Sequence, residues 1–197
     1  MTQVVRGAGR PSCCEFDALL RAAWALALCE SPPMAEFLRG ANEDDQFERA
    51  IAFRVGHHLA TLIQAARSAW ASPFVQATVD MELHRKTHGT LKLPAGPGAE
   101  PRRIFPDLIV HVRGRQDANL LVVEFKASSN HNLEQRTKDR EVVYDLVMDL
   151  GYSYGVCADF DVAQRTMKLG AWLGGVSDCS LHPAFRGDRA MYLKDGT

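Results

Sequence analysis

The sequence predicts an α/β sandwich with a central mixed β-sheet, and three observations lead to this prediction. Apolar residues recur with helical period before residue 70 and again over 133–150, which predicts helices in both regions. A β-hairpin lies between these regions, and residues 152–173 read as two further strands. The resulting order is helices, three strands, a helix and two strands. This order is typical of an α/β domain.

In the N-terminal part of the chain, the sequence predicts a flexible tail over residues 1–11, followed by helices. Ser12 can cap a helix from about Glu15 to Cys29. A short helix is expected over Met34 to Arg39. A longer helix runs from a cap at Asn42 to about Ala69, because its apolar residues keep helical spacing.

The middle of the chain predicts strands. Alternation of apolar and polar residues from Phe74 to Arg85 indicates a strand, and the prolines and glycines of Leu93 to Pro101 indicate a loop. The hairpin follows, with one strand over Asp107 to Arg113, a turn over Gly114 to Ala118 and a return strand over Asn119 to Lys126. The later strands are expected over Tyr152 to Phe160 and Thr166 to Leu173.

Three charged side chains gather at one end of this hairpin. With the turn centred near Gln116, antiparallel pairing sets Asp107 beside Glu124 and Lys126. Glu124 and Lys126 are two residues apart and share a face of the sheet, whereas Phe125 points to the other face. Like charges opposite each other on a sheet repel. Two carboxylates brought together beside a lysine therefore indicate a site for a divalent cation.

Composition narrows the class of protein. The chain has 197 residues, of which 46% are hydrophobic and 24% charged, as in an ordinary globular protein. The formal net charge of −1 gives no general sign of nucleic-acid binding, although a local basic rim remains compatible with it. Five cysteines without CxxC spacing argue against disulfides and a zinc knuckle, and favour a cytoplasmic location. No apolar run reaches membrane-spanning length, so no membrane partner is expected.

The sequence Pro106-Asp107, followed by Glu124-Phe125-Lys126 on the paired strand, resembles the PD-(D/E)XK nuclease superfamily with its restriction-endonuclease-like fold. The phrase Val79-Asp80-Met81-Glu82-Leu83-His84-Arg85 is also similar to an uncharacterised bacterial branch of that superfamily. The resemblance implies a three-layer sandwich with an αβββαβ core. That core would occupy about 43–173 of a single domain over 12–197, preceded by a helical extension over 12–40.

The resemblance also implies roles for individual residues. Asp107 and Glu124 would hold Mg²⁺ or Mn²⁺, with the backbone carbonyl of Phe125 as a further ligand. Lys126 would position or activate the attacking water. Glu48, on the preceding helix, would complete the catalytic site, with Glu43, Asp44 and Asp45 as substitutes. Glu82 is a further candidate acid. Apart from the resemblance, Arg102 and Arg103 stand just before Pro106-Asp107 and are candidates to bind phosphate groups, as is Arg136.

Each of these residues also has a purely structural interpretation. Glu124 and Lys126 can form a weak ion pair at an exposed strand end. Glu48 can simply stabilise the first turn of its helix through the macrodipole. Glu82 can be a solvated strand residue, and Arg136, Lys138 and Arg140 can be solvated helix charges. None of the seven histidines lies in a metal-binding pattern, so none is assigned to a metal.

The function expected from this sequence is a metal-dependent hydrolase of the nuclease class, cutting phosphodiester bonds in DNA by means of an activated water. A homodimer would suit a double-strand cut. The alternatives are a catalytically silent protein of the same fold that binds nucleic acid or protein, and an interaction subunit of a defence or repair system. In the second alternative the N-terminal helices would form the docking surface.

Overall fold

The computed structural model describes residues 9–29, 45–81, 91–93, 102–161 and 163–174, without the side chains of residues 45–47, 91–93 and 102–103. A six-stranded sheet forms the centre of the described part. Its strands follow the spatial order β1 (Thr78–Met81), β4 (Leu108–His111), β5 (Asn119–Ala127), β6 (Tyr154–Asp161) and β7 (Thr166–Leu169). The last strand, β8 (Leu173–Gly174), also pairs with β6.

The sheet is mixed, as predicted. β5 and β6 are parallel, whereas β1–β4, β4–β5, β6–β7 and β6–β8 are antiparallel. A parallel neighbour requires a crossover connection. Here the crossover contains helix α5 (Leu133–Asp149), and the segment between β1 and β4 contains a small separate sheet of β2 (Leu91–Leu93) and β3 (Arg102–Ile104).

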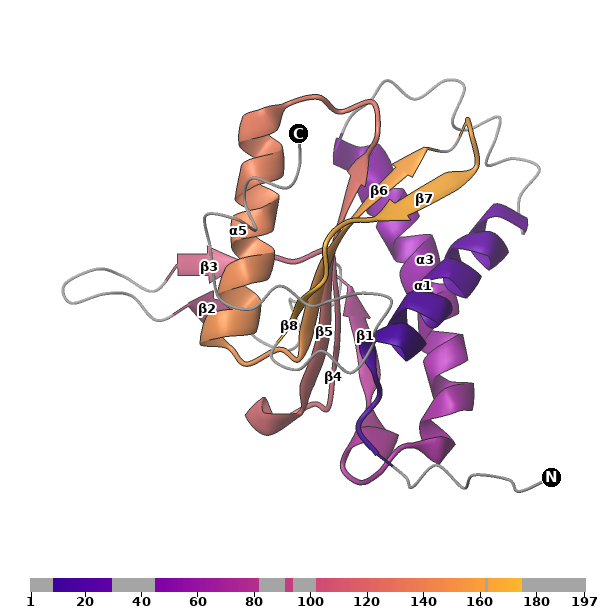
Figure 1. Ribbon diagram of the computed structural model, residues 1–197, viewed down its shortest axis with the longest axis vertical. Helices are drawn as coiled ribbons and strands as arrows, with labels where there is room; N and C mark the ends of the chain where they lie inside the picture. The colour runs from indigo at the N-terminus through magenta and orange to yellow at the C-terminus, as the bar shows by residue number, and fades with distance from the viewer. Residues whose placement is uncertain (1–8, 30–44, 82–90, 94–101, 162, 175–197) are drawn as a thin grey trace.

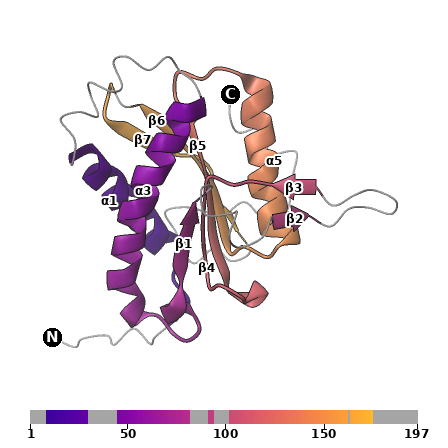
Figure 2. The ribbon, with the colours of Figure 1, turned by 180° about the vertical axis from the view of Figure 1, so that it is seen from behind.

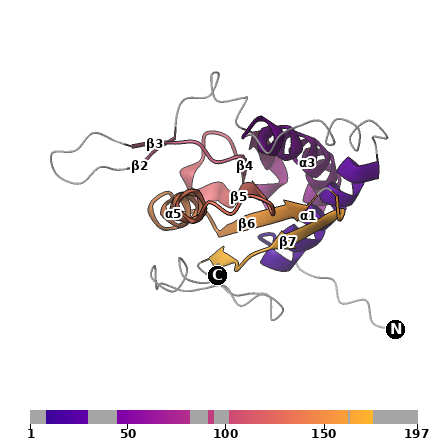
Figure 3. The ribbon, with the colours of Figure 1, turned by 90° about the horizontal axis from the view of Figure 1, so that it is seen from above.

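Helices cover both faces of the central sheet. Helices α1 (Cys13–Cys29) and α3 (Asp45–Ala66) lie together on one face, and α5 lies on the other (Figures 1 and 2). The view from above in Figure 3 shows the sheet between these two helical layers. The α/β class and the placement of helices around a mixed sheet therefore agree with the prediction. Among the described helices, none is both long and apolar enough to span a lipid bilayer.

The larger part of the core lies between the sheet and the α1–α3 pair. Each helix contributes an apolar stripe at helical spacing, and β5 contributes alternate residues. The α1 stripe includes Phe16, Leu20 and Ala23, and the α3 stripe includes Ile51, Val55 and Leu59. The β5 residues on this face are Leu121, Val123, Phe125 and Ala127. These residues are almost fully buried, so this layer fixes the position of α3 relative to β5.

A smaller apolar cluster holds α5 against the opposite face. Val143, Leu146 and Val147 of α5 pack against Val122 of β5. Gly155 of β6 allows this close approach, because a Cβ atom there would lie 2.5 Å from Val143 Cγ1 and 2.8 Å from Val147 Cγ2. Since real Cβ atoms do not come so close to other atoms, any larger residue at this position would push α5 away from the sheet.

The start of α1 agrees with the prediction in detail. The Ser12 hydroxyl accepts a hydrogen bond from Glu15 N, and Glu15 Oε2 accepts one from Ser12 N at 2.8 Å. This reciprocal pattern is a capping box. Of the expected tail, residues 9–11 are described, and Gly9 forms an isolated bridge with Trp70, so these last tail residues are attached to the domain.

Several boundaries differ from the prediction. Only Thr78–Met81 of the expected strand Phe74 to Arg85 is described as a strand, because Phe74–Gln76 forms a 3₁₀ turn in which Ala77 N donates to Phe74 O. The strand β3 at Arg102–Ile104 was not predicted. The expected strand Thr166 to Leu173 is divided into β7 and β8. Met34 to Arg39 and the cap Asn42 lie outside the described residues.

The cysteine prediction was partly wrong. Cys14 is disulfide-bonded, although the cysteine spacing argued against disulfides. Cys13, Cys29 and Cys157 form no disulfide, and Cys13, the first residue of α1, is buried in the core.

Candidate active site at the end of β5

The predicted hairpin exists, and its register brings the expected residues together. β4 and β5 pair with Leu108 opposite Val123, and continuing this register by one residue places Asp107 opposite Glu124. A hydrogen bond of 2.8 Å from Phe125 N to Asp107 Oδ2 fixes Asp107 at this end of the hairpin. Opposite residues of an antiparallel pair share a face of the sheet. Asp107, Glu124 and Lys126 therefore belong to the same face, as the sequence predicted.

This face of β5 is the one covered by α5. Val122 packs against α5, and Glu124 and Lys126 continue the same alternation toward the end of the strand. Both charged residues are buried, with 7% of Glu124 and 8% of Lys126 exposed. The interpretation of Glu124 and Lys126 as an exposed, solvated strand end is therefore wrong.

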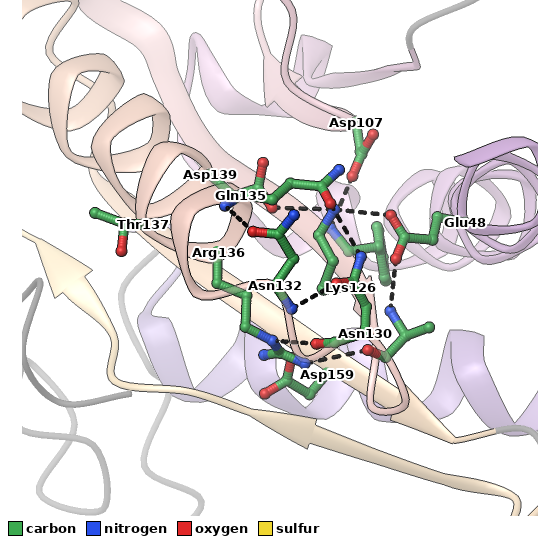
Figure 4. Close-up of polar contacts among 12 residues, drawn as sticks. Glu48, Asp107, Lys126, Asn130, Asn132, Gln135, Arg136, Thr137, Asp139 and Asp159 are labelled. Atoms are coloured by element: carbon green, nitrogen blue, oxygen red, sulfur yellow. Dashed lines mark hydrogen bonds and ion pairs between the residues drawn. The ribbon is translucent and has the colours of Figure 1, made fainter. Parts of the chain in front are cut away.

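Glu48 reaches the site from the first turn of α3. Its Oε2 atom accepts a hydrogen bond from Lys126 Nζ at 2.8 Å, and its Oε1 atom accepts one from Ala127 N at 3.0 Å (Figure 4). Glu48 lies three, four and seven residues before Ile51, Ala52 and Val55, so it occupies the buried stripe of its helix. Stabilisation of the helix start alone does not account for this placement. Glu48 belongs to the Lys126 site.

Asp139 of α5 is the member of the site that was not predicted. Its Oδ2 atom lies 3.1 Å from Lys126 Nζ, on the other side of the ammonium group from α3 (Figure 4). Asp139 precedes Val143 and Val147 by one and two helical turns, so it continues the apolar stripe of α5. A carboxylate at a core-facing position was the sequence signal for this residue, and Glu48 shows the same signal on α3.

The charges of the site shift the pKa values of its members. Burial alone lowers the pKa of Lys126, but the hydrogen bond that Lys126 donates to Glu48 and the charges of Asp139 and Glu48 outweigh burial and raise the pKa above its ordinary value. Burial raises the pKa of the Asp139 carboxyl, and the nearby Lys126 ammonium only partly offsets this effect. Lys126 is therefore a protonated cation between two acids at neutral pH.

Arg136 anchors the connection between β5 and α5. Its guanidinium donates to Ala127 O at 3.1 Å, to Asn130 O at 2.6 Å and to Asp159 Oδ1 at 2.7 Å. With 16% of its side chain exposed, Arg136 is occupied by internal partners. The alternative that Arg136 is a solvated helix charge is wrong, whereas the expectation that it binds a substrate phosphate stays a prediction. Together with Glu48, it holds the backbone of Ala127 from both sides.

Other predicted residues lie elsewhere. Glu82, Glu43 and Asp44 are outside the described residues. Arg102 and Arg103 belong to β3, but their side chains, like that of Asp45, are not described. His111 contacts Asp80 at 2.8 Å, which places it in a different cluster near the edge of the sheet.

Asp107, Glu124 and the Phe125 carbonyl are the hard oxygen donors that the sequence predicted for a metal ion. Within the described ranges, no group of three or more His, Cys, Asp or Glu side chains is arranged to hold a metal ion. Mg²⁺ is usually held by one or two carboxylates together with substrate phosphates and water, rather than by a complete protein cage. Two carboxylates on one face of a hairpin therefore fit Mg²⁺ or Mn²⁺ better than an ion that needs a closed set of side-chain ligands.

Comparison of the chain with protein-family models, curated proteins and solved structures finds no match. The function must therefore be inferred from the residues and geometry of this protein itself.

Proposed function

We propose that this protein is a metal-dependent nuclease that hydrolyses phosphodiester bonds, with DNA as its substrate. The observation that supports this function is the convergence of four residues from three segments of the chain. The β4–β5 register, continued by one residue beyond Leu108 and Val123, supports a position of Asp107 opposite Glu124, with Lys126 next on the same face of β5. Glu48 joins them from α3 through its hydrogen bond to Lys126.

These residues have complementary chemical roles. Asp107, Glu124 and the carbonyl of Phe125 would hold Mg²⁺ or Mn²⁺. When bound, such an ion polarises a phosphoryl oxygen and lowers the pKa of a water molecule. Asp107 would be oriented for this task by its hydrogen bond from Phe125 N, because that bond fixes one oxygen of the carboxylate.

Lys126 would act as a cation rather than as a base. Its raised pKa means that it has no vacant lone pair with which to take a proton from water at neutral pH. An ammonium group can instead donate hydrogen bonds to a phosphate oxygen and stabilise the negative charge that develops there. Glu48 would keep the ammonium group in place, since its second oxygen is itself fixed by Ala127 N.

The direct test is incubation of the purified protein with supercoiled plasmid and with short DNA duplexes, in the presence of Mg²⁺ or Mn²⁺. We expect cleavage by the wild type and a loss of about 10²–10³-fold in Asp107→Ala and Lys126→Ala. Asp80→Asn is a matched control, because it removes a buried carboxylate from the same sheet outside this site. Cleavage that persists unchanged in Asp107→Ala or Lys126→Ala would reject the proposed site.

Calorimetric titration with Mn²⁺ separates this function from that of a silent relative with the same fold. A nuclease should bind Mn²⁺ through Asp107 and Glu124, and Glu124→Gln should weaken that binding. Nucleic-acid binding without Mn²⁺ uptake and without cleavage would favour the silent binding protein. DNA and RNA duplexes of equal sequence, offered in parallel, define the substrate class.

A further inference from the structure

We propose that Asp139 is the displaceable partner of Lys126, which holds the ammonium group until a substrate phosphate takes its place. The proposal rests on the proposed function for the identity of that phosphate. It concerns a residue on α5 that lies outside the motif at the end of β5, and it assigns different tasks to the two acids that contact Lys126.

The two acids hold Lys126 unequally. Glu48 contacts Nζ at 2.8 Å and also accepts a hydrogen bond from Ala127 N, so both of its oxygens are engaged. Asp139 contacts Nζ at the longer distance of 3.1 Å. Displacing Glu48 would break two hydrogen bonds and leave a buried backbone donor unsatisfied, which is costly. Displacing Asp139 from Nζ breaks a single ion pair.

Asp139 is also more accessible to solvent than Glu48. The Glu48 side chain is 9% exposed and the Asp139 side chain is 25% exposed. A carboxylate that leaves Lys126 loses its counter-charge. Unless water then hydrates it, the buried charge is uncompensated and the free-energy cost is large. Asp139 can turn toward water by rotation of its side chain. Glu48 is enclosed between α3 and the backbone of β5 and has no comparable alternative.

A phosphate oxygen is a chemical substitute for the Asp139 carboxylate oxygen. Both are anionic acceptors, and both form short charge-assisted hydrogen bonds with an ammonium group. Lys126 carries one positive charge and faces two carboxylates, so an incoming anion meets a cation that is already neutralised. Asp139 therefore competes with the phosphate for Lys126, and its negative charge repels that phosphate.

This competition predicts opposite effects for two conservative substitutions. Asp139→Asn removes the competing charge with little change in shape, and should strengthen binding of inorganic phosphate about three- to tenfold. Glu48→Gln should weaken phosphate binding, because the ammonium group loses its fixed support. Asp149→Asn is the matched control for Asp139→Asn. It makes the same change on an exposed residue of α5, about 15 Å further along the helix.

The experiment is a titration of full-length protein with inorganic phosphate, followed by the ¹⁵N resonance of the Lys126 ammonium group. Its assignment comes from the loss of that signal in Lys126→Met. Tighter binding in Asp139→Asn, together with unchanged binding in Asp149→Asn, supports the proposal. Equal or weaker binding in Asp139→Asn overturns it, as does wild-type binding in Lys126→Met, because phosphate would then bind elsewhere.

A second variant keeps the test decisive if Asp139→Asn does not fold. Asp139→Ser also removes the charge and is smaller, so the same tightening of phosphate binding is expected. The DNA cleavage assay is scored separately. Absence of cleavage in the wild type would reject the nuclease function while leaving the phosphate titration interpretable. Cleavage without tighter phosphate binding in the charge-removing variants would reject only the role of Asp139.

Discussion

The sheet carries two buried charged clusters with opposite charge balance. Near the edge, the carboxylate of Asp80 on β1 has two basic partners, His111 at 2.8 Å and the guanidinium of Arg113. At the end of β5, the single cation of Lys126 has two acidic partners, Glu48 and Asp139. Every residue in both clusters is hydrogen-bonded or ion-paired, so the presence of buried charge alone does not distinguish them.

The two clusters differ in whether their acidic groups are already balanced by basic groups. Burial raises the pKa of Asp80, but the hydrogen bonds from His111 and Arg113 outweigh burial and hold the pKa well below its ordinary value. That carboxylate is fully engaged by its two basic partners. The Lys126 cluster has an excess of acid, because two carboxylates contact one ammonium group. We therefore interpret the Asp80 cluster as structural and propose the Lys126 cluster as the functional one.

The largest expected effect is that of Lys126→Met. It leaves Glu48 and Asp139 facing each other without a counter-charge, which should lower the free energy of unfolding by about 3–5 kcal/mol. Because burial raises the pKa of Asp139, that carboxyl can take up a proton in the variant, and the loss should be smaller at pH 5 than at pH 8. Urea denaturation at both pH values measures this.

Repeating the denaturation of Lys126→Met in the presence of Mn²⁺ tests whether a divalent ion occupies the acidic cluster. Mn²⁺ should restore part of the lost stability of Lys126→Met if it occupies the acidic cluster, and it should not stabilise Asp80→Asn beyond the wild-type response. A loss of stability that is equal at pH 5 and pH 8 would contradict the role given to Asp139.

The next effect in size is that of Asp80→Asn, for which we expect a loss of about 1–3 kcal/mol at neutral pH with DNA cleavage retained. The sign of its pH dependence follows from the lowered pKa of Asp80. The folded state binds the Asp80 proton more weakly than the unfolded state, so the stabilisation is complete above the ordinary carboxyl pKa near 4 and is lost as the pH falls further.

The difference in unfolding free energy between wild type and Asp80→Asn should therefore be constant from about pH 6 to 8 and decrease below about pH 4. Chemical denaturation across this range measures it. A difference that grows on acidification would contradict the assignment of Asp80 as an ionised partner of Arg113.

The smallest effect is expected for Arg113→Met. The Arg113 side chain is 47% exposed, whereas that of Lys126 is 10% exposed. Solvent screens the Arg113 ion pair, and His111 still contacts Asp80 when Arg113 is removed, so a loss of about 1 kcal/mol or less is expected. Thermal denaturation of Arg113→Met and Lys126→Met side by side tests whether exposure separates the two clusters. Equal losses of stability in the two variants would contradict the expectation that exposure makes the Arg113 ion pair weaker than that of Lys126.

The sequence predicted those parts of the site that depend on local pairing. Asp107, Glu124 and Lys126 follow from a hairpin whose two strands pair antiparallel as predicted, although an unpredicted β-bulge between Val110 and His111 shifts the register near the turn. The resemblance supplied Glu48. The contact of Glu48 with Lys126 depends on how α3 packs across the sheet, which no local pattern specifies.

Asp139 and Arg136 were not assigned their roles for a related reason. Arg136 was interpreted as a solvated charge on a charge-rich helix, and Asp139 was not considered. The packing of α5 against Val122 places Asp139 on the inward face. The boundary errors have local causes. Phe74 to Gln76 was predicted as a strand because a 3₁₀ turn has no apolar period of its own that would distinguish it. β3 was missed because three residues are too few to show an alternation of apolar and polar side chains.

The close seating of α5 on Gly155 has a kinetic consequence. With Val143 and Val147 already against the backbone of β6, the helix has no space in which to shift toward the sheet. Exchange of partners at Lys126 is then left to the torsions of single side chains, instead of helix displacements that take microseconds or longer. Arrival of the substrate, rather than rearrangement of the protein, would set the pace of this step.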